Sequence, residues 1–119
     1  MENWTIYNIM NVEIMDLDDK TVVSISGREL MAGNVRNFKE AMAETLDSRD
    51  KIVIDLGNLE FIDSVGLGAL VTCLKRVRQR QGEIKLCRMS NSVQNLFHMV
   101  KLERVFQIFD SLDAALASF

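Results

Sequence analysis

Short apolar runs alternate with helical patterns along the whole chain. Four of these runs are rich in β-branched residues and predict β-strands. After its first residue, Lys51, the second run is apolar except for Asp55, which is typical of a strand covered on both faces of a sheet. The four predicted strands are Thr21–Ser26, Lys51–Leu56, Ile84–Cys87 and Val105–Phe109.

The N-terminal segment is less regular. Apolar and polar residues alternate between Thr5 and Leu17, but the alternation is interrupted, so the segment fits either one long strand or two short ones. A hairpin turn is predicted to follow, supplied by Asp16, Asp18, Asp19 and Lys20.

Between the predicted strands, apolar residues recur every three or four positions, as in helices with one buried face. Residues that can cap a helix N-terminus stand at the start of these segments, and Gly82 ends the second one. The predicted helices run from Asn34 to about Ser48, from Ser64 to about Gln81, from Ser90 or Asn91 to about Val100, and from Ser111 or Asp113 onward.

Strands that alternate with helices need crossover connections, so most of the sheet is predicted to be parallel or mixed, with an N-terminal hairpin at one side. The chain has 119 residues, which is enough for one hydrophobic core, and no proline, repeat or linker divides it. We therefore expect a single α/β domain spanning residues 1–119.

Composition and charge narrow the range of functions. Hydrophobic residues make up 48% of the chain and charged residues 26%, as in an ordinary globular protein. The formal net charge of -3 argues against direct binding of nucleic acid, since no positive field attracts phosphates. No apolar run reaches the roughly 18 residues that span a bilayer, and Met1-Glu2-Asn3 is not the basic start of a signal peptide. We expect a cytoplasmic protein with no membrane partner.

Cysteine and histidine residues do not form a metal-binding pattern. Cys73, Cys87 and the single histidine, His98, fall on three different predicted elements, without the spacing of metal ligands. We expect two buried thiols in a reducing compartment, and no metal or cofactor.

The segment from Ile52 to Leu70, IVIDLGNLEFIDSVGLGAL, is the most informative part of the chain. A buried strand runs into a tight acidic turn, after which Ser64 opens a helix that contains two glycines. Free backbone N–H groups and the helix dipole favour an anionic group, such as a phosphate, at a helix N-terminus. The hydroxyl oxygen of Ser64 is therefore the candidate functional atom.

The two sides of this helix differ in composition. At about 100° per residue, one side is apolar and is predicted to face the core. The other side is small and partly apolar, where a solvated face is normally charged. The two glycines, Gly66 and Gly68, each destabilise the helix by roughly 1 kcal/mol relative to alanine, which indicates that another group approaches the helix backbone closely. Alternatively, they pack against a neighbouring helix or set the turn. The core side carries Leu67, Leu70, Val71, Leu74 and Val77, and the outward side Val65, Gly68, Ala69, Thr72, Arg76 and Gln79.

The motif FIDSVGLG at Phe61–Gly68, preceded by the IVIDL strand, resembles the signature of the STAS domain of bacterial anti-sigma factor antagonists. The resemblance implies a mixed sheet of four to five strands with four to five helices. Many members have Gly-x-Leu-Asp after the second strand, whereas here the acid, Glu29, comes one position early and Met31 follows Leu30. Further similar motifs are GREL at 27–30, GEIKLC at 82–87, SxxVxxLF at 90–97, KLxxVFxI at 101–108 and DAAL at 113–116.

The resemblance also implies partner switching. Such proteins, when unphosphorylated, bind a serine kinase of the histidine-kinase-like ATPase superfamily that doubles as an anti-sigma factor, and thereby free its sigma factor. The kinase phosphorylates a serine or threonine after the motif's aspartate, and a PP2C-type phosphatase reverses the reaction. On this chain the resemblance assigns the acceptor to Ser64, preceded by Asp63, and implies no enzymatic activity. The expected partner-binding residues are Asp63, Ser64, Val65, Gly66, Gly68, Ala69, Thr72 and Arg76.

Three other functions are compatible with the pattern. Ser64 could be an enzyme nucleophile, but G-x-S-x-G is absent and no histidine is placed as a base. The helix start could bind a nucleotide or phosphate, although it lacks the lysine-containing glycine-rich loop of phosphate-binding NTPases. The domain could also be an interaction or scaffold subunit of another signalling or transport complex.

Overall fold

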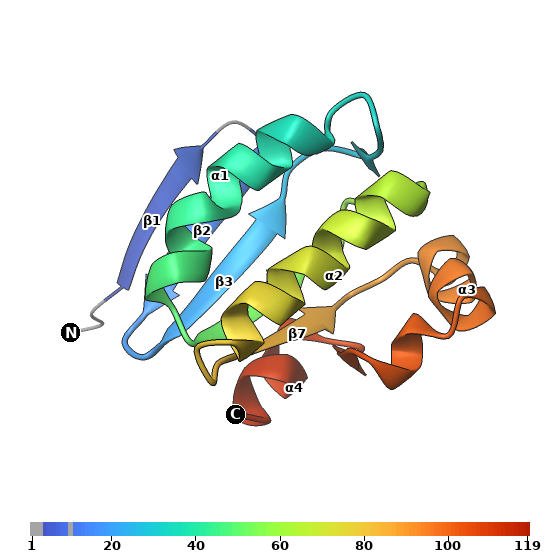
Figure 1. The fold of residues 1–119 in the computed structure, drawn as a ribbon. Helices are drawn as coiled ribbons and strands as arrows, with labels where there is room; N and C mark the ends of the chain where they lie inside the picture. Colours follow the sequence, from blue (N-terminus) through green and yellow to red (C-terminus); the bar gives the residue numbers. More distant parts are fainter. Residues whose placement is uncertain (1–3, 10) are drawn as a thin grey trace.

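A six-stranded mixed sheet forms the centre of the protein in a computed structural model that describes residues 4–9 and 11–119 (Figure 1). The strand order is β1-β2-β3-β5-β7-β8, and β4 and β6 form a separate two-stranded sheet. The strands are β1 (Trp4–Ile9), β2 (Val12–Leu17), β3 (Lys20–Ile25), β4 (Glu29–Leu30), β5 (Lys51–Asp55), β6 (Phe61–Ile62), β7 (Glu83–Cys87) and β8 (Gln107–Phe109). The helices are α1 (Val35–Ser48), α2 (Ser64–Arg78), α3 (Asn91–Met99) and α4 (Leu112–Ala117), with a 3₁₀ turn η1 at Leu102–Arg104.

The predicted α/β class and mixed sheet are confirmed. β1, β2 and β3 form an antiparallel meander, whereas β3, β5, β7 and β8 run parallel to one another through helical crossovers. The predicted number of four to five strands was too low by one for this sheet. The segment Thr5–Leu17 divides into two strands, β1 and β2, and both pair within the sheet. The last strand begins two residues later than predicted, at Gln107, because η1 precedes it.

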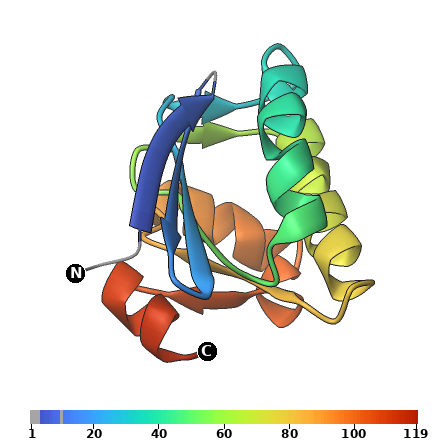
Figure 2. The same ribbon diagram turned by 90° about the vertical axis from the view of Figure 1, so that its left-hand side faces the viewer.

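Helices cover the two faces of the sheet unequally. α1 and α2 lie side by side on one face, and α4 lies on the other (Figures 1 and 2). Most of the core lies under α1 and α2, where alternate residues of β3, β5 and β7 such as Val23, Ile54 and Leu86 are fully buried. Successive side chains of a strand point to opposite faces, so the residues adjacent to these, such as Val53 beside Ile54, face α4.

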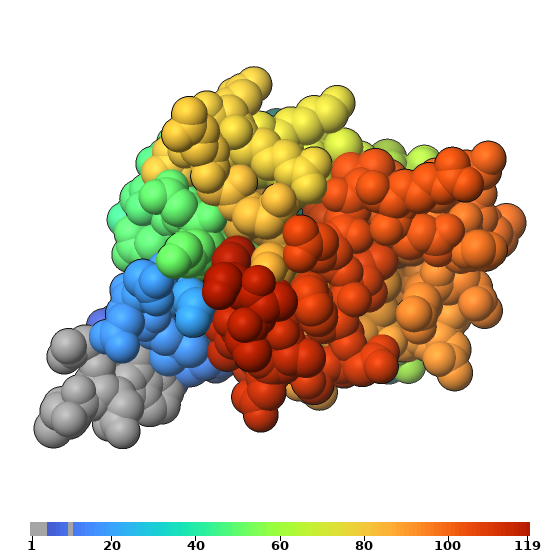
Figure 3. Space-filling view, turned by 90° about the horizontal axis from the view of Figure 1, so that it is seen from below, coloured from blue at the N-terminus to red at the C-terminus, as the bar shows by residue number. Residues whose placement is uncertain are grey.

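The C-terminal helix α4 packs on this second face through a smaller cluster around Val53, Cys87 and Ala115. In the space-filling view it lies between the N-terminal strands, in blue, and the deep orange segment that follows α3 (Figure 3). Lys85 on β7 is buried there. Its ammonium group donates to Ser118 Oγ at 2.6 Å and lies 4.2 Å from the centre of the Phe119 ring.

The small sheet of β4 and β6 determines where α2 begins. Leu30 of β4 pairs with Ile62 of β6, and α2 starts two residues after Ile62. The N–H groups of Glu60 and Phe61 both donate to the carbonyl oxygen of Arg28, at 2.7 and 3.0 Å. The start of α2 is therefore held against the segment that connects β3 to α1.

Candidate functional site

Ser64 is the first residue of α2, and its side chain is exposed. The N-cap is the preceding residue, Asp63, in an extended backbone conformation. Its Oδ1 atom accepts a hydrogen bond from the Gly66 N–H at 2.9 Å. Asp63 thus satisfies one of the free N–H groups that every helix start leaves. Ser64 stands where the sequence places it, at the helix N-terminus, but it is not the cap.

The second carboxylate oxygen of Asp63 reaches another part of the chain. Its Oδ2 atom accepts from the Ala32 N–H at 3.0 Å, in the loop between β4 and α1. The N–H donors of Ala32 and Gly66 stabilise the ionised carboxylate and lower the pKa of Asp63 below its ordinary value. A fixed negative charge therefore stands directly beside Ser64.

Four of the predicted partner-binding residues share the exposed side of α2. These are Ser64, Val65, Gly68 and Thr72, and none of them carries a charge. The side chain of Val65 is unusually exposed for an apolar residue, at 43%. An alanine Cβ built at Gly68 would have nothing within 4 Å, so the backbone is open to solvent at this position.

Ala69 and Gly66 do not belong to this surface, and the placement of Ala69 on the outward side of α2 was wrong. Ala69 is only 3% exposed, and Gly66 is also buried. A Cβ atom at Gly66 would lie 2.1 Å from the carbonyl oxygen of Leu30. The backbone that comes close to Gly66 is therefore the protein's own, and it belongs to strand β4 and not to a neighbouring helix.

The neighbouring helix α1 explains why the buried arc of α2 is wider than predicted. Arg76 follows Ala69 and Cys73 along one side of α2, and its guanidinium group forms two hydrogen bonds with the carboxylate of Asp47 on α1, at 2.9 and 2.7 Å. That side of α2 consequently faces α1. Val71, which was assigned to the core side, is only half-buried. Arg76 has an exposed side chain, but it is engaged with α1.

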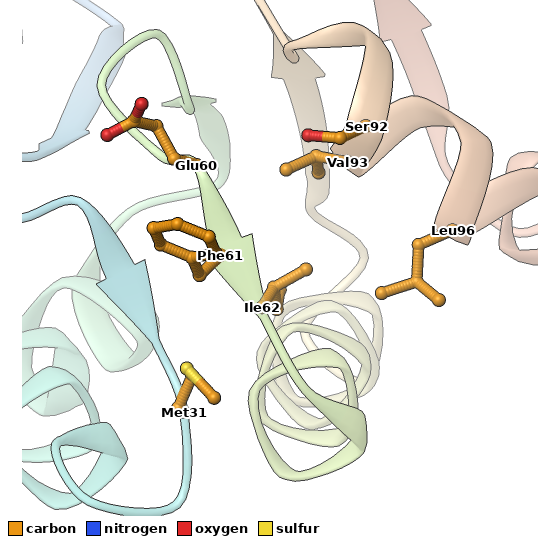
Figure 4. A pocket seen from close by; sticks show the side chains of 7 residues that line it. All are labelled: Met31, Glu60, Phe61, Ile62, Ser92, Val93 and Leu96. Carbon is orange, nitrogen blue, oxygen red and sulfur yellow. The ribbon is translucent and has the colours of Figure 1, made fainter.

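A groove between β6 and α3 was not expected from the sequence (Figure 4). Phe61, three residues before Ser64, is 55% exposed, and Ile62 lies between it and α3 in the close-up view. The sequence held no signal for this exposure, because a strand of two residues is too short to show an alternation of apolar and polar positions. The cavity measures about 180 Å³ and is lined by Met31, Glu60, Phe61, Ile62, Ser92, Val93 and Leu96.

The other candidate groups lie away from Ser64. Cys73 and Cys87 are free and buried, and burial raises the pKa of each thiol to about 12. His98 on α3 is exposed and contacts Glu103 through Nδ1, at 2.7 Å from Oε2. Within residues 4–9 and 11–119, no group of three or more His, Cys, Asp or Glu side chains is arranged to hold a metal ion. In the same part of the chain, no helix is long and apolar enough to cross a membrane.

Comparison with known proteins agrees with the fold and the motif. The STAS domain family matches residues 10–115, and the chain belongs to this family. It is 32% identical to an anti-sigma-B factor antagonist of Listeria monocytogenes, over 83% of this chain and 88% of that protein. It is 35% identical to an anti-sigma F factor antagonist of Paenibacillus polymyxa, over 76% and 78% respectively.

The fold itself recurs in a solved structure. The crystal structure of an anti-sigma factor antagonist from Mycobacterium paratuberculosis superimposes with a TM-score of 0.82, over 96% of this chain and 93% of that one, at 24% identity. This likeness concerns the arrangement of helices and strands. The family membership inferred from the motifs around Ser64 is confirmed by the sequence matches.

Proposed function

We propose that this protein is an anti-sigma factor antagonist that works as a phosphorylation-controlled partner switch. Without phosphate, it binds an anti-sigma factor that is also a serine kinase of the histidine-kinase-like ATPase superfamily, and so frees a sigma factor. Phosphorylation of Ser64 by that kinase dissociates the complex, and a PP2C-type phosphatase restores the unmodified form. The protein acts by binding and has no catalytic residue of its own.

One observation carries the proposal: the Ser64 hydroxyl is exposed at the start of α2, among uncharged exposed residues. Val65 follows it, and Gly68 and Thr72 continue the same side of the helix. Phe61 lies just before it, with more than half of its side chain exposed. Exposed apolar side chains around a modifiable hydroxyl favour a protein partner that contacts both.

The expected effect of phosphorylation follows from charge. A phosphate on Ser64 adds about 1.5 to 2 negative charges at neutral pH. The helix N-terminus lowers the cost of this charge within the free domain, so the fold is expected to persist. In a complex, the phosphate would be desolvated beside the Asp63 carboxylate, which costs several kcal/mol unless a cation pairs with it. A loss of about 4 kcal/mol weakens a complex roughly a thousandfold.

The proposal is tested by incubating the chain with ATP and each anti-sigma factor kinase encoded in the source genome, followed by mass spectrometry. We expect stoichiometric phosphate on Ser64 and none on Ser64→Ala, which should keep the wild-type fold. A Ser64→Glu variant should bind the same kinase more weakly than wild type but more tightly than the phosphorylated protein, since a carboxylate carries one charge. Equal phosphate on wild type and Ser64→Ala would refute the assignment.

The same experiment separates the other functions. A scaffold subunit or a nucleotide-binding domain has no need of kinase-dependent phosphate on Ser64, and a nucleophilic enzyme would lose a reaction in Ser64→Ala. Only a partner switch predicts that one modification both labels Ser64 and releases the kinase.

A further inference from the structure

The side chain of Asp63 connects the loop between β4 and α1 to the first turn of α2 by hydrogen bonds. Asp63 accepts the Gly66 N–H through Oδ1 at 2.9 Å and the Ala32 N–H through Oδ2 at 3.0 Å. The missing side chain at Gly66 lets the Leu30 carbonyl come close to the helix. The loop therefore rests directly on the turn of helix that begins with Ser64.

At its other end, the loop is held by the side chain of Asn34. Oδ1 of Asn34 accepts from the Met31 N–H at 2.8 Å, and Nδ2 of Asn34 donates to the carbonyl oxygen of Glu29 at 2.8 Å. Asn34 makes no side-chain hydrogen bond to the helix α1 that follows it. Both of its side-chain hydrogen bonds therefore shape the loop.

The tied loop faces the surface around Ser64. Met31 lines the same groove as Phe61, and Ala32 and Gly33 are exposed. A kinase that reaches the Ser64 hydroxyl from this side meets the loop and the helix start together. If the loop were not held in place, binding of the kinase would have to order it. The apparent affinity for the kinase would then be reduced in proportion to the fraction of molecules that have the loop in place.

We propose that Asp63 is a positioning residue for the phosphorylation of Ser64, which it serves by holding the Met31–Gly33 loop against the first turn of α2. The inference rests on the proposed function and assigns Asp63 a role within the protein, where the sequence suggested contact with the partner. A carboxylate is required because both of its oxygens accept, one from each N–H group. Asparagine at this position has one acceptor oxygen, and its NH₂ group would oppose the second N–H donor.

One substitution at Asp63 should remove only one of its two hydrogen bonds. Asparagine is as good an N-cap as aspartate, so Asp63→Asn keeps the hydrogen bond to Gly66 and loses the one to Ala32. Asn34→Ala loosens the same loop without changing Asp63. Asp113→Asn, in the first turn of α4, is the matched control for removing an acid near a helix start. We expect it to resemble wild type in every measurement below.

Two measurements test the inference. Amide hydrogen exchange by NMR should be at least about tenfold faster at Ala32 in Asp63→Asn, and within about threefold of wild type at Gly66. With the kinase that phosphorylates the wild-type chain most rapidly, Asp63→Asn and Asn34→Ala should each raise KM about tenfold or more. Both should leave kcat within about threefold, because the chemical step on the hydroxyl is unchanged.

The outcomes are distinguishable. Wild-type protection of Ala32 in Asp63→Asn, or a wild-type KM in either variant, would overturn the inference and leave the proposed function intact. A raised KM in Asp63→Asn alone would show direct contact with the kinase instead. If none of the kinases phosphorylates Ser64 of the wild-type chain, the proposed function is wrong and the inference falls with it.

Discussion

The two glycines of α2 are expected to respond to alanine in opposite directions, although they are two residues apart in one helix. At Gly68 an added Cβ has nothing within 4 Å, so alanine should bring only its better helix propensity. That difference is about 0.8 to 1 kcal/mol in favour of alanine. We expect Gly68→Ala to raise the free energy of unfolding by this amount.

At Gly66 the same methyl group would lie 2.1 Å from the Leu30 carbonyl oxygen and 2.9 Å from Cγ1 of Ile62. An ordinary contact begins near 3.4 Å, so the backbone at Leu30 must move by about 1.3 Å (3.4 − 2.1). A shift of that size would disturb the pairing of β4 with β6 and the tie from Asp63 to Ala32. Overpacking against backbone typically destabilises by 1 to 3 kcal/mol, and we expect Gly66→Ala to lose about 2 kcal/mol or more.

Urea unfolding of the two variants measures both effects. We expect the midpoints to move in opposite directions at an unchanged slope. The melting temperature should rise by about 4 °C in Gly68→Ala and fall by about 8 °C or more in Gly66→Ala. Equal shifts in the same direction would refute the assignment of Gly66 to a packing role and Gly68 to an open surface.

Binding provides an independent readout on the same pair. If the kinase approaches α2 along Ser64, Val65 and Gly68, then Gly68→Ala should be more stable than wild type and bind the kinase more weakly. No defect in folding could explain that combination. Unchanged binding by Gly68→Ala would instead move the contact surface toward the groove at Phe61.

Two further predictions concern packing and charge. Ala69→Arg should destabilise the fold by at least about 3 kcal/mol, since the site is 3% exposed, whereas the exposed Thr72→Arg should change stability by about 0.5 kcal/mol or less, as measured by thermal melting. Asp16 accepts hydrogen bonds from Arg49 and Thr21, which lower the pKa of its carboxyl group, so its contribution to stability is present above its unfolded pKa and lost as the pH falls through the lower folded value. Asp16→Asn should therefore be less stable than wild type by about 1 kcal/mol at pH 7. In a series of urea titrations this difference should shrink as the pH falls below the unfolded pKa, and a difference that stays constant from pH 7 down to acidic pH would contradict the prediction.

The sequence predicted the longer elements of this fold well, because the helices show periodic apolar positions and the central strands stand out as short apolar runs. The range predicted for α1 matches the structure, and the strands β5 and β7 agree to within a residue. The N-terminal segment was harder, since the break between β1 and β2 leaves little trace in an interrupted alternation. The pairing of β4 with β6 joins residues about thirty positions apart in two-residue strands, and such short strands have no period to detect.

The faces of α2 show what the pattern of apolar residues alone cannot predict. A helical wheel places residues relative to one partner surface, here the sheet, and by that measure Ala69 points outward. The structure adds a second surface, α1, which widens the buried arc to include Ala69 and Cys73. A small residue on a predicted outer face is thus compatible with a close neighbour helix as well as with a docking site. Distinguishing these readings requires the tertiary arrangement.

Under the proposed function, the arrangement of α2 also accounts for a change of partner without unfolding. Its inner side, around Leu70 and Leu74, is fully buried and holds the core, whereas Ser64 lies at the exposed end of the same helix. A phosphate there meets a helix start that favours negative charge but also the Asp63 carboxylate, which already occupies the Gly66 N–H. In the free domain the phosphate stays hydrated, whereas in a complex the bound partner would exclude water from it. The proposed switch therefore requires only the difference between these two environments and no rearrangement of the core.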